Sequence, residues 1–377
     1  MAGIYIHIPF CKQACHYCNF HFSTSFEKYR TQMIDAICSE IELQANFFED
    51  KKTSVHTVYF GGGTPSILTQ NEFEQIWSAL NHAFDLNEVQ EVTLEANPDD
   101  MEDAFFEMIA SSHINRLSIG VQSFDNLDLA YLNRVHDASK AISVIERSLN
   151  AGIDKISTDL IFGIPTSGKN RLEKDIRILA NIGVNHISAY ALTVEPDTAL
   201  DHLIKKKKSI PVDESKSAEE MFWLMDFLPQ LGYEQYETSN FSLPGCEAKH
   251  NSSYWHDIPY LGIGPSAHSY KKPIRSWNIS NNMQYIRSIE QGKLAQESEI
   301  LDQVSIYNEW VMTKIRLREG ILFKEVEELF GKNISKKFIL SIEPYILSGD
   351  VIYSGNTFNL SKKGQLLTDA ITSCLFL

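Results

Sequence analysis

The stretch that decides the fold is residues 4–20, which read IYIHIPFCKQACHYCNF. Its first residues form a short strand-like run. Pro9 has no N–H to donate to a sheet, so the strand is expected to end near Ile8 and release the chain into a loop. That loop carries three cysteines in C-x3-C-x2-C spacing, Cys11, Cys15 and Cys18. The sequence therefore predicts three thiolates gathered on one loop directly after the first strand.

Three thiols on one loop indicate a metal site with an open position. Thiolates are soft ligands for iron-sulfur clusters or zinc, and purely structural sites usually have four protein ligands. Phe20 occupies the place two residues beyond Cys18, and no second cysteine pair follows. A 4Fe-4S cluster held by three cysteines keeps one iron free for an exogenous ligand. The alternative is a zinc loop, or a disulfide with one spare thiol, but three cysteines satisfy neither tetrahedral zinc nor paired disulfides.

At these cysteines the sequence resembles the radical S-adenosylmethionine superfamily. The resemblance implies that the amino and carboxylate groups of S-adenosylmethionine chelate the open iron. It also implies that one electron from the cluster cleaves the sulfonium to methionine and a 5′-deoxyadenosyl radical, while the protein orients the reactants. Such proteins use a partial barrel of six strand-helix units, with the cluster in the loop after the first strand.

Composition limits the classes of protein to consider. The 377 residues, 43% of them apolar, suffice for one large and one smaller domain. Lys and Arg total 34 against 49 for Asp and Glu, and the net charge of −15 disfavours a broad nucleic-acid-binding surface. No run of 18 apolar residues occurs, and the N-terminus lacks the pattern of a cleaved leader. We expect a cytoplasmic protein, with membrane contact only through a partner.

Strand and helix patterns alternate along the first half of the chain. Six strand-then-helix units without reversal predict an α/β fold with parallel strands, and a partial (β/α)6 barrel rather than a doubly wound sheet. Periodicity does not separate the two, and the resemblance favours the barrel. After the first strand, strands are predicted at 56–60, 91–95, 116–121, 155–162 and 186–192, and helices at 26–48, 71–84, 101–111, 139–150 and 172–182.

The alternation of strand and helix patterns ends at about residue 200. We expect a barrel over 1–200, a connecting region over 201–300 and a C-terminal domain over 301–377. Within the connecting region we expect a helix over about 213–231, an extended stretch over 233–239 and then a loop-rich segment up to about residue 282. In that domain, helices precede two short strand-like runs joined by Gly355 and Asn356, which is a hairpin signal. This α+β arrangement resembles a winged helix. The acidic composition favours a packing or partner module over a nucleic-acid-binding one.

Polar residues follow the predicted strands where a barrel places its chemistry. The turn Gly61–Pro65, GGGTP, lacks the Cβ atoms that would keep its backbone away from a ligand. Glu95 is an acid at the end of the third strand, Asp159 lies in the fifth strand, and Arg134 follows the fourth strand. Buried charges need partners, and a zwitterion with ribose hydroxyls would supply them. The alternative is a network of salt bridges within the barrel mouth.

Five segments narrow the resemblance: YIHIPFC, GGGTP, EANP, VQSF and DLIFGIP. Together they resemble the oxygen-independent coproporphyrinogen oxidase family over nearly the whole chain. Taken residue by residue, this resemblance implies that S-adenosylmethionine contacts Tyr5, Gly62, Gly63, Thr64, Glu95, Gln122, Arg134, Asp159 and Ala191.

Two branches of that family must be weighed. The dehydrogenases carry a long N-terminal extension and a further cysteine two residues after the third, whereas this sequence offers two residues before Gly3 and has Phe20 there. Both differences favour the HemW-type haem chaperone branch, whose H-N-x-x-Y-W motif matches residues 250–255. The branch implies haem as cargo, because imidazole ligates haem iron and aromatic faces cover the macrocycle. The haem contacts it implies are His250, Tyr254 and Trp255.

The alternative is a purely structural role for this motif, in which His250 hydrogen-bonds within its loop and Trp255 packs in the core. Our leading hypothesis is a chaperone that holds a 4Fe-4S cluster and S-adenosylmethionine and passes haem to a respiratory acceptor protein, with a homodimer left open. One rival is coproporphyrinogen III dehydrogenase, which removes two propionates by radical oxidative decarboxylation. A radical enzyme acting on tRNA is the other, suggested by the C-terminal domain and disfavoured by the net charge. No nucleic-acid partner is expected.

Overall fold

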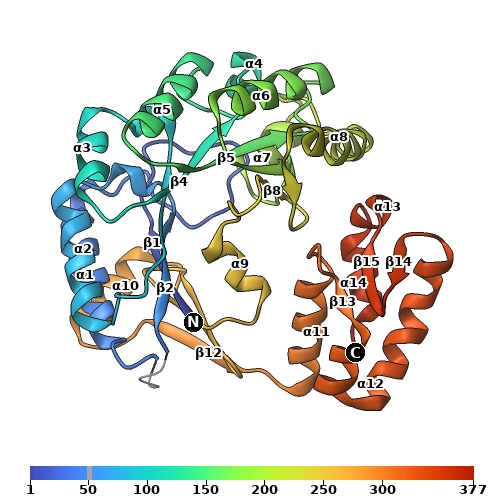
Figure 1. The fold of residues 1–377 in the computed structure, drawn as a ribbon. Coiled ribbons are helices and arrows are strands. Elements are labelled where there is room, and N and C mark those ends of the chain that lie inside the picture. Colours follow the sequence, from blue (N-terminus) through green and yellow to red (C-terminus); the bar gives the residue numbers. More distant parts are fainter. Residues whose placement is uncertain (49–52) are drawn as a thin grey trace.

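The computed structural model describes residues 1–48 and 53–377, and six parallel strands form its centre. They lie side by side in chain order, with their helices packed around the outside (Figure 1). The predicted partial (β/α)6 barrel is confirmed. Its strands are β1 (Ala2–Ile8), β2 (Val55–Gly62), β3 (Glu91–Ala96), β4 (Arg116–Gln122), β5 (Lys155–Phe162) and β6 (His186–Ala191).

Local signals fix the ends of the outer helices. A capping box between Thr69 and Glu72 starts α2, the Asp137 side chain caps α5, and Gly183 ends α6 in the left-handed conformation. The helix predicted over 26–48 is shorter, because turns replace it after Leu43. The helices are α1 (Arg30–Leu43), α2 (Gln70–Ala83), α3 (Asp103–Ser111), α4 (Asn126–Tyr131), α5 (Ala138–Asn150) and α6 (Lys169–Ile182).

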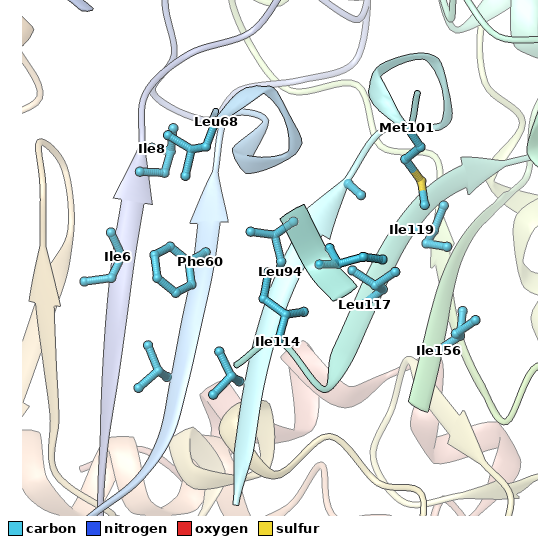
Figure 2. Close-up of a cluster of buried hydrophobic side chains, with 14 of the residues drawn as sticks. Ile6, Ile8, Phe60, Leu68, Leu94, Met101, Ile114, Leu117, Ile119 and Ile156 are labelled. Carbon is cyan, nitrogen blue, oxygen red and sulfur yellow. The ribbon is translucent and has the colours of Figure 1, made fainter. Parts of the chain in front are cut away.

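The two faces of the central strands carry different kinds of side chain. Ile6 and Ile8 of β1 are fully buried in an apolar layer that continues through Phe60 to the neighbouring strands (Figure 2). Because successive side chains of a strand point to opposite faces, Tyr5 and His7 project from the other face, into the barrel. The apolar layer supports the strands from outside, which leaves the interior for polar and aromatic groups.

Short strands extend the sheet at both edges. β8 (Asn240–Ser242) pairs antiparallel with β6, and β9 (Tyr260–Ile263) pairs parallel with β1. The expectation of a loop-rich segment up to residue 282 was therefore wrong. These strands contain two to five residues, too few for a periodic pattern to show. The remaining elements are β7 (Glu234–Gln235), β10 (His268–Lys271), β11 (Ile274–Asn278), β12 (Gln296–Ile300), α7 (Ala199–Lys205), α8 (Glu214–Phe227), α9 (Lys249–Trp255) and α10 (Asn282–Glu290).

The C-terminal domain has its own core around Phe338 and Phe358. Its three strands pair antiparallel in the order β13-β15-β14. Gly355 and Asn356 both have positive φ, as a two-residue type I′ hairpin requires, so the predicted hairpin is confirmed. The elements are α11 (Gln303–Lys314), β13 (Ile321–Leu322), α12 (Phe323–Leu347), β14 (Val351–Ser354), β15 (Thr357–Leu360), α13 (Lys362–Gln365) and α14 (Thr368–Leu375).

The C-terminal domain packs against the β7–β8 edge of the sheet. Arg318 forms an ion pair with Glu234 at 2.5 Å, and Gln235 Nε2 donates a hydrogen bond to Gln365 Oε1 at 2.8 Å. α9 lies between this domain and the central strands (Figure 1). None of the helices in the described parts of the chain combines the length and apolar character needed to cross a membrane.

Candidate functional site

The glycine turn after β2 is joined to the base of the cysteine loop. The Gly63 N–H donates to the Ile8 carbonyl at 2.9 Å, and the Thr64 N–H donates to the Phe10 carbonyl at 2.7 Å. A Cβ on Gly63 would lie 2.5 Å from the Phe10 oxygen, and one on Gly62, whose φ is +107°, would lie 2.6 Å from the His7 ring. The close approach that requires glycine is thus to this chain's own first strand and loop.

Two of the three cysteine sulfurs accept hydrogen bonds from side chains. Thr64 Oγ1 donates to the buried Cys11 Sγ at 3.2 Å, and Arg134 Nη1 donates to Cys15 Sγ at 3.3 Å. Burial raises the pKa of the Cys11 thiol to about 12, so a thiolate there needs a positively charged group or metal nearby. Hydrogen bonds to sulfur are one of the means by which proteins tune iron-sulfur clusters.

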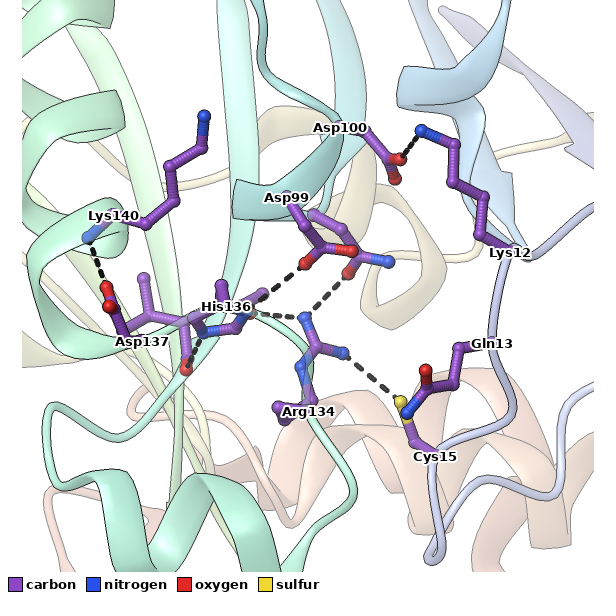
Figure 3. A network of polar contacts seen from close by, with 12 residues as sticks. Lys12, Gln13, Cys15, Asp99, Asp100, Arg134, His136, Asp137 and Lys140 are labelled. Atoms are coloured by element: carbon purple, nitrogen blue, oxygen red, sulfur yellow. Dashed lines mark hydrogen bonds and ion pairs between the residues drawn. The ribbon is translucent and has the colours of Figure 1, made fainter.

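Arg134 is held in place on both sides (Figure 3). Its Nη2 donates to Asn97 Oδ1 and to the Gly120 carbonyl, each at 2.7 Å, while Nη1 reaches Cys15. On the other side of the loop, Lys12 forms an ion pair with the buried Asp100 at 2.5 Å. The cysteine loop is therefore tied to the ends of β3 and β4 by charged contacts, which orient the guanidinium toward the sulfur.

The donor set fits an iron-sulfur cluster. Within residues 1–48 and 53–377, no three His, Cys, Asp or Glu side chains are grouped as ligands of a single metal ion. The cysteines of a 4Fe-4S cluster each bind a different iron, and three thiols on one loop, with side-chain donors to two of the sulfurs, fit that role.

Two acids face the interior of the barrel. Glu95 accepts hydrogen bonds from the Tyr59 hydroxyl at 2.7 Å and from the Gly62 N–H at 3.1 Å. Burial, with the nearby charge of Asp159, raises the pKa of Glu95 to about 7, and burial raises the pKa of Asp159 to about 6. Carboxyl groups with raised pKa values in a cleft are suited to a ligand that brings positive charge or hydroxyl donors.

The other predicted contact residues lie around the same mouth. Gln122 ends β4 with φ of +68°, where the register with β5 shifts. Ala191 ends β6 and is exposed. Tyr5 lies in β1 and bonds through its hydroxyl to His7 Nδ1 at 3.1 Å. Thr64 contacts Cys11, as described above. Tyr5 and Asp159 lie farther along the barrel interior, each three residues before the end of its strand, whereas the rest of the set gathers at the carboxyl ends of the strands and their loops.

α9 brings the 250–255 motif into the barrel interior. His250 is 1% exposed, and its ring stacks on Tyr59 with 5.0 Å between centroids. Its Nδ1 lies 2.9 Å from Thr57 Oγ1 and its Nε2 lies 2.9 Å from the Tyr254 hydroxyl, so both nitrogens are engaged. Burial lowers the pKa of His250 to about 3, and the ring is neutral at physiological pH. In this arrangement His250 positions Tyr254.

A cavity of about 630 Å³ joins the barrel interior to the C-terminal domain. This volume lies within the usual range for small-molecule sites. Sequence reasoning missed the contribution of the C-terminal domain and of Tyr59, because no local motif marks residues that meet only through packing. Its lining includes Tyr5, Tyr59 and Glu95 from the barrel, Tyr254 and Trp255 from α9, and Arg316, Thr368 and Asp369 from the C-terminal domain.

Comparison with known proteins identifies two family regions. Residues 5–179 match the model described as the Radical SAM superfamily, and residues 301–367 match the HemN C-terminal domain. The first region includes the cysteine loop and five of the six central strands. The second lies within the C-terminal domain that closes one side of the cavity.

Curated relatives cover nearly the full length of the chain. The protein named "Heme chaperone HemW" of Lactococcus lactis is 33% identical over 334 residues, 89% of this chain and 86% of that protein. The protein of the same name from Bacillus subtilis is 29% identical, with 98% of each chain covered. The solved structure of coproporphyrinogen III oxidase (HemN) from Escherichia coli superposes with a TM-score of 0.86 at 21% identity, over 100% of this chain and 90% of that one. This last likeness concerns the fold.

Proposed function

The chain belongs to the HemW-type branch of the radical S-adenosylmethionine superfamily, and on that premise we propose that it is a haem chaperone. In this proposal it carries a 4Fe-4S cluster and S-adenosylmethionine, binds haem as cargo and passes the haem to an acceptor protein. The observation that supports the proposal is the cavity between α9 and the C-terminal domain, whose lining includes Tyr59 and the interior acid Glu95.

The cysteine loop is the proposed cluster site. Cys11, Cys15 and Cys18 would each bind one iron, with Thr64 and Arg134 donating hydrogen bonds to sulfur. When bound, the cluster supplies an electron. The proposed S-adenosylmethionine site is the mouth above it, where Glu95 and Asp159 offer acceptors for hydroxyl or ammonium groups. The full proposed contact set is Tyr5, Gly62, Gly63, Thr64, Glu95, Gln122, Arg134, Asp159 and Ala191.

Haem is proposed to occupy the cavity with its macrocycle against Tyr254 and Trp255 of α9. Aromatic faces suit a flat, apolar ring system, and Arg316, which pairs with Asp369 on the cavity wall at 2.6 Å, would exchange that partner to bind a propionate. Because both nitrogens of His250 are engaged, its proposed contribution to haem binding is to hold the Tyr254 hydroxyl in place. The acceptor class suggested by the family resemblance is a respiratory haem protein.

Haem titration of the cluster-loaded protein tests this site. We expect a shifted Soret band and quenching of Trp255 fluorescence at one haem per cavity. Ser239→Trp places an indole in the cavity and is expected to abolish the shift. Ser78→Trp is the matched control, because Ser78 lines a separate surface groove between α2 and α3 and its substitution leaves the cavity open.

The result that contradicts the proposal is equal haem binding by both tryptophan variants, which would locate haem outside the cavity. The same samples test the dehydrogenase alternative. Anaerobic incubation with coproporphyrinogen III should leave that compound unchanged, and its addition should cause no formation of 5′-deoxyadenosine. Conversion to protoporphyrinogen would replace the chaperone proposal with the enzyme.

A further inference from the structure

A series of aromatic rings leads from the cavity to the outer surface. Tyr254 lines the cavity, and its ring centroid lies 4.7 Å from that of Tyr260. Tyr260 lies 6.1 Å from Tyr270, to which it is paired across β9 and β10. Tyr270 is half-buried and bonds to the exposed Asp257. Three tyrosines in successive contact thus connect the cavity with solvent.

The first and last of these phenols each have a proton acceptor. The Tyr254 hydroxyl lies 2.9 Å from His250 Nε2, which accepts in the tautomer that carries its hydrogen on Nδ1 beside Thr57. The Tyr270 hydroxyl donates to Asp257 Oδ1 at 2.5 Å. A second phenol on the cavity wall follows the same pattern, since Tyr59 donates to Glu95 at 2.7 Å.

Proton acceptors matter because of what oxidation does to tyrosine. Burial raises the pKa of Tyr254 and Tyr270 above the usual phenol value, so neither ionises at neutral pH. A phenol that loses an electron becomes a strong acid, and a base already within hydrogen-bond distance takes the proton without diffusion. Tyr254 and Tyr270 therefore have the surroundings that allow reversible one-electron oxidation to a neutral tyrosyl radical.

We propose that Tyr254, Tyr260 and Tyr270 form a relay that carries oxidising equivalents from the haem cavity to the surface. The oxidant is hydrogen peroxide acting on bound haem, and the reductant is an external hydrogen-atom donor such as ascorbate. This inference rests on the proposed function, because it needs haem in the cavity. It adds an activity to that function, namely the reduction of haem that peroxide has oxidised while the haem is bound in the cavity.

The electrons and protons balance as follows. Each peroxide becomes two water molecules by taking two electrons and two protons in total. Each electron leaves Tyr254 as its proton moves to His250. Tyr254 then regains an electron from Tyr260 and its proton from His250, while Tyr260 keeps its phenol proton as a short-lived radical cation and takes an electron from Tyr270, whose proton moves to Asp257. At the surface one ascorbate returns one electron to Tyr270, Asp257 returns the proton, and ascorbate releases one proton to solvent, from which the peroxide takes its two protons. Two ascorbates are oxidised by one electron each for every peroxide reduced.

The test uses cluster-loaded, haem-loaded full-length protein mixed with one equivalent of hydrogen peroxide. Freeze-quench electron paramagnetic resonance with ring-deuterated tyrosine detects the radical, and ascorbate oxidation is followed in parallel. In the unaltered chain we expect a tyrosyl radical on Tyr270. Tyr260→Phe keeps the ring packing but interrupts the relay, so the Tyr270 radical and the ascorbate oxidation should be lost while a radical persists on Tyr254.

Two further variants guard against indirect effects. Tyr260→Trp restores a ring that can be oxidised and should restore ascorbate oxidation, which a purely structural role for the Tyr260 hydroxyl would not allow. Tyr353→Phe, an exposed tyrosine of the C-terminal hairpin, should change nothing. The proposal is overturned if Tyr260→Phe retains the Tyr270 radical in full or if the unaltered chain forms no tyrosyl radical. Soret titration of each sample separates these outcomes from a failure of haem binding, which would overturn the proposed function itself.

Discussion

Replacing Glu40 with glutamine should change how stability depends on pH. Glu40 of α1 is completely buried and joins the barrel to the segment around β9–β11 and α10. Its carboxyl group accepts hydrogen bonds from the Tyr285 hydroxyl at 2.5 Å, from Asn278 Nδ2 at 2.7 Å and from the Gly264 N–H at 2.8 Å. These donors do not offset the cost of burial, which raises the pKa of Glu40 to about 7 from the model-compound value of 4.5.

The sign and size follow from that difference. Since the folded pKa lies above the unfolded one, the stability associated with the protonated acid is complete below pH 4.5 and is lost as pH rises to about 7. A difference of about 2.5 units corresponds to about 3 kcal/mol, of which about 2 kcal/mol falls between pH 5.5 and 8. Glutamine cannot ionise, so the free energy of unfolding of Glu40→Gln should lack this loss.

Urea unfolding of both chains at pH 5.5 and pH 8 measures the effect. The two chains share all other titrating groups, including the buried histidines, so these cancel in the difference between them. Glu88→Gln, at an exposed position of the α2–β3 loop, is the control and should follow the unaltered chain. Parallel pH profiles for the unaltered chain and Glu40→Gln would refute the assignment of this dependence to Glu40.

Three further substitutions test the site and the C-terminal domain. Gly63→Ala places a Cβ 2.5 Å from the Phe10 carbonyl oxygen and should lower the iron and labile sulfide content per chain. Gly168→Ala is the control, because a Cβ there would have no atom within 4 Å and should leave the cluster content unchanged. Equal cluster content in the two variants would contradict this prediction. Arg134→Lys loses the planar fork and should weaken S-adenosylmethionine binding roughly tenfold in calorimetry, and unchanged affinity would exclude Arg134 from the site. Gly355→Val, at φ +58°, should destabilise the hairpin by about 1–2 kcal/mol in urea unfolding; an unchanged midpoint would show that the turn adapts.

The sequence predicted the parts of this structure that local pattern controls. Each central strand is a run of residues with a clear apolar or β-branched character, and Arg116–Gln122 lies within one residue of the predicted 116–121. The hairpin at Gly355 follows from the φ values that its turn type demands. The cysteine loop follows from spacing alone, because its three thiols lie within eight residues.

Contacts between distant segments were beyond such reasoning. His250 bonds to Thr57, 193 residues away, and no local pattern indicates that α9 enters the barrel. The motif at 250–255 suggested haem contacts, which stay a prediction, and only the folded chain shows that the imidazole lies between the hydroxyl groups of Thr57 and Tyr254. The cavity likewise depends on the packing of the C-terminal domain against the barrel, so Arg316 and Thr368 carried no signal in sequence. Periodicity reports which face of an element is buried but not which element covers it.

An iron anomalous difference map of anaerobically grown, haem-loaded crystals tests the central claim most directly. We expect two iron-containing sites in each chain, the cluster between Cys11, Cys15 and Cys18 and one haem iron in the cavity beside Tyr254. A zinc signal at the cysteines without iron, or haem iron located away from the cavity, would contradict it.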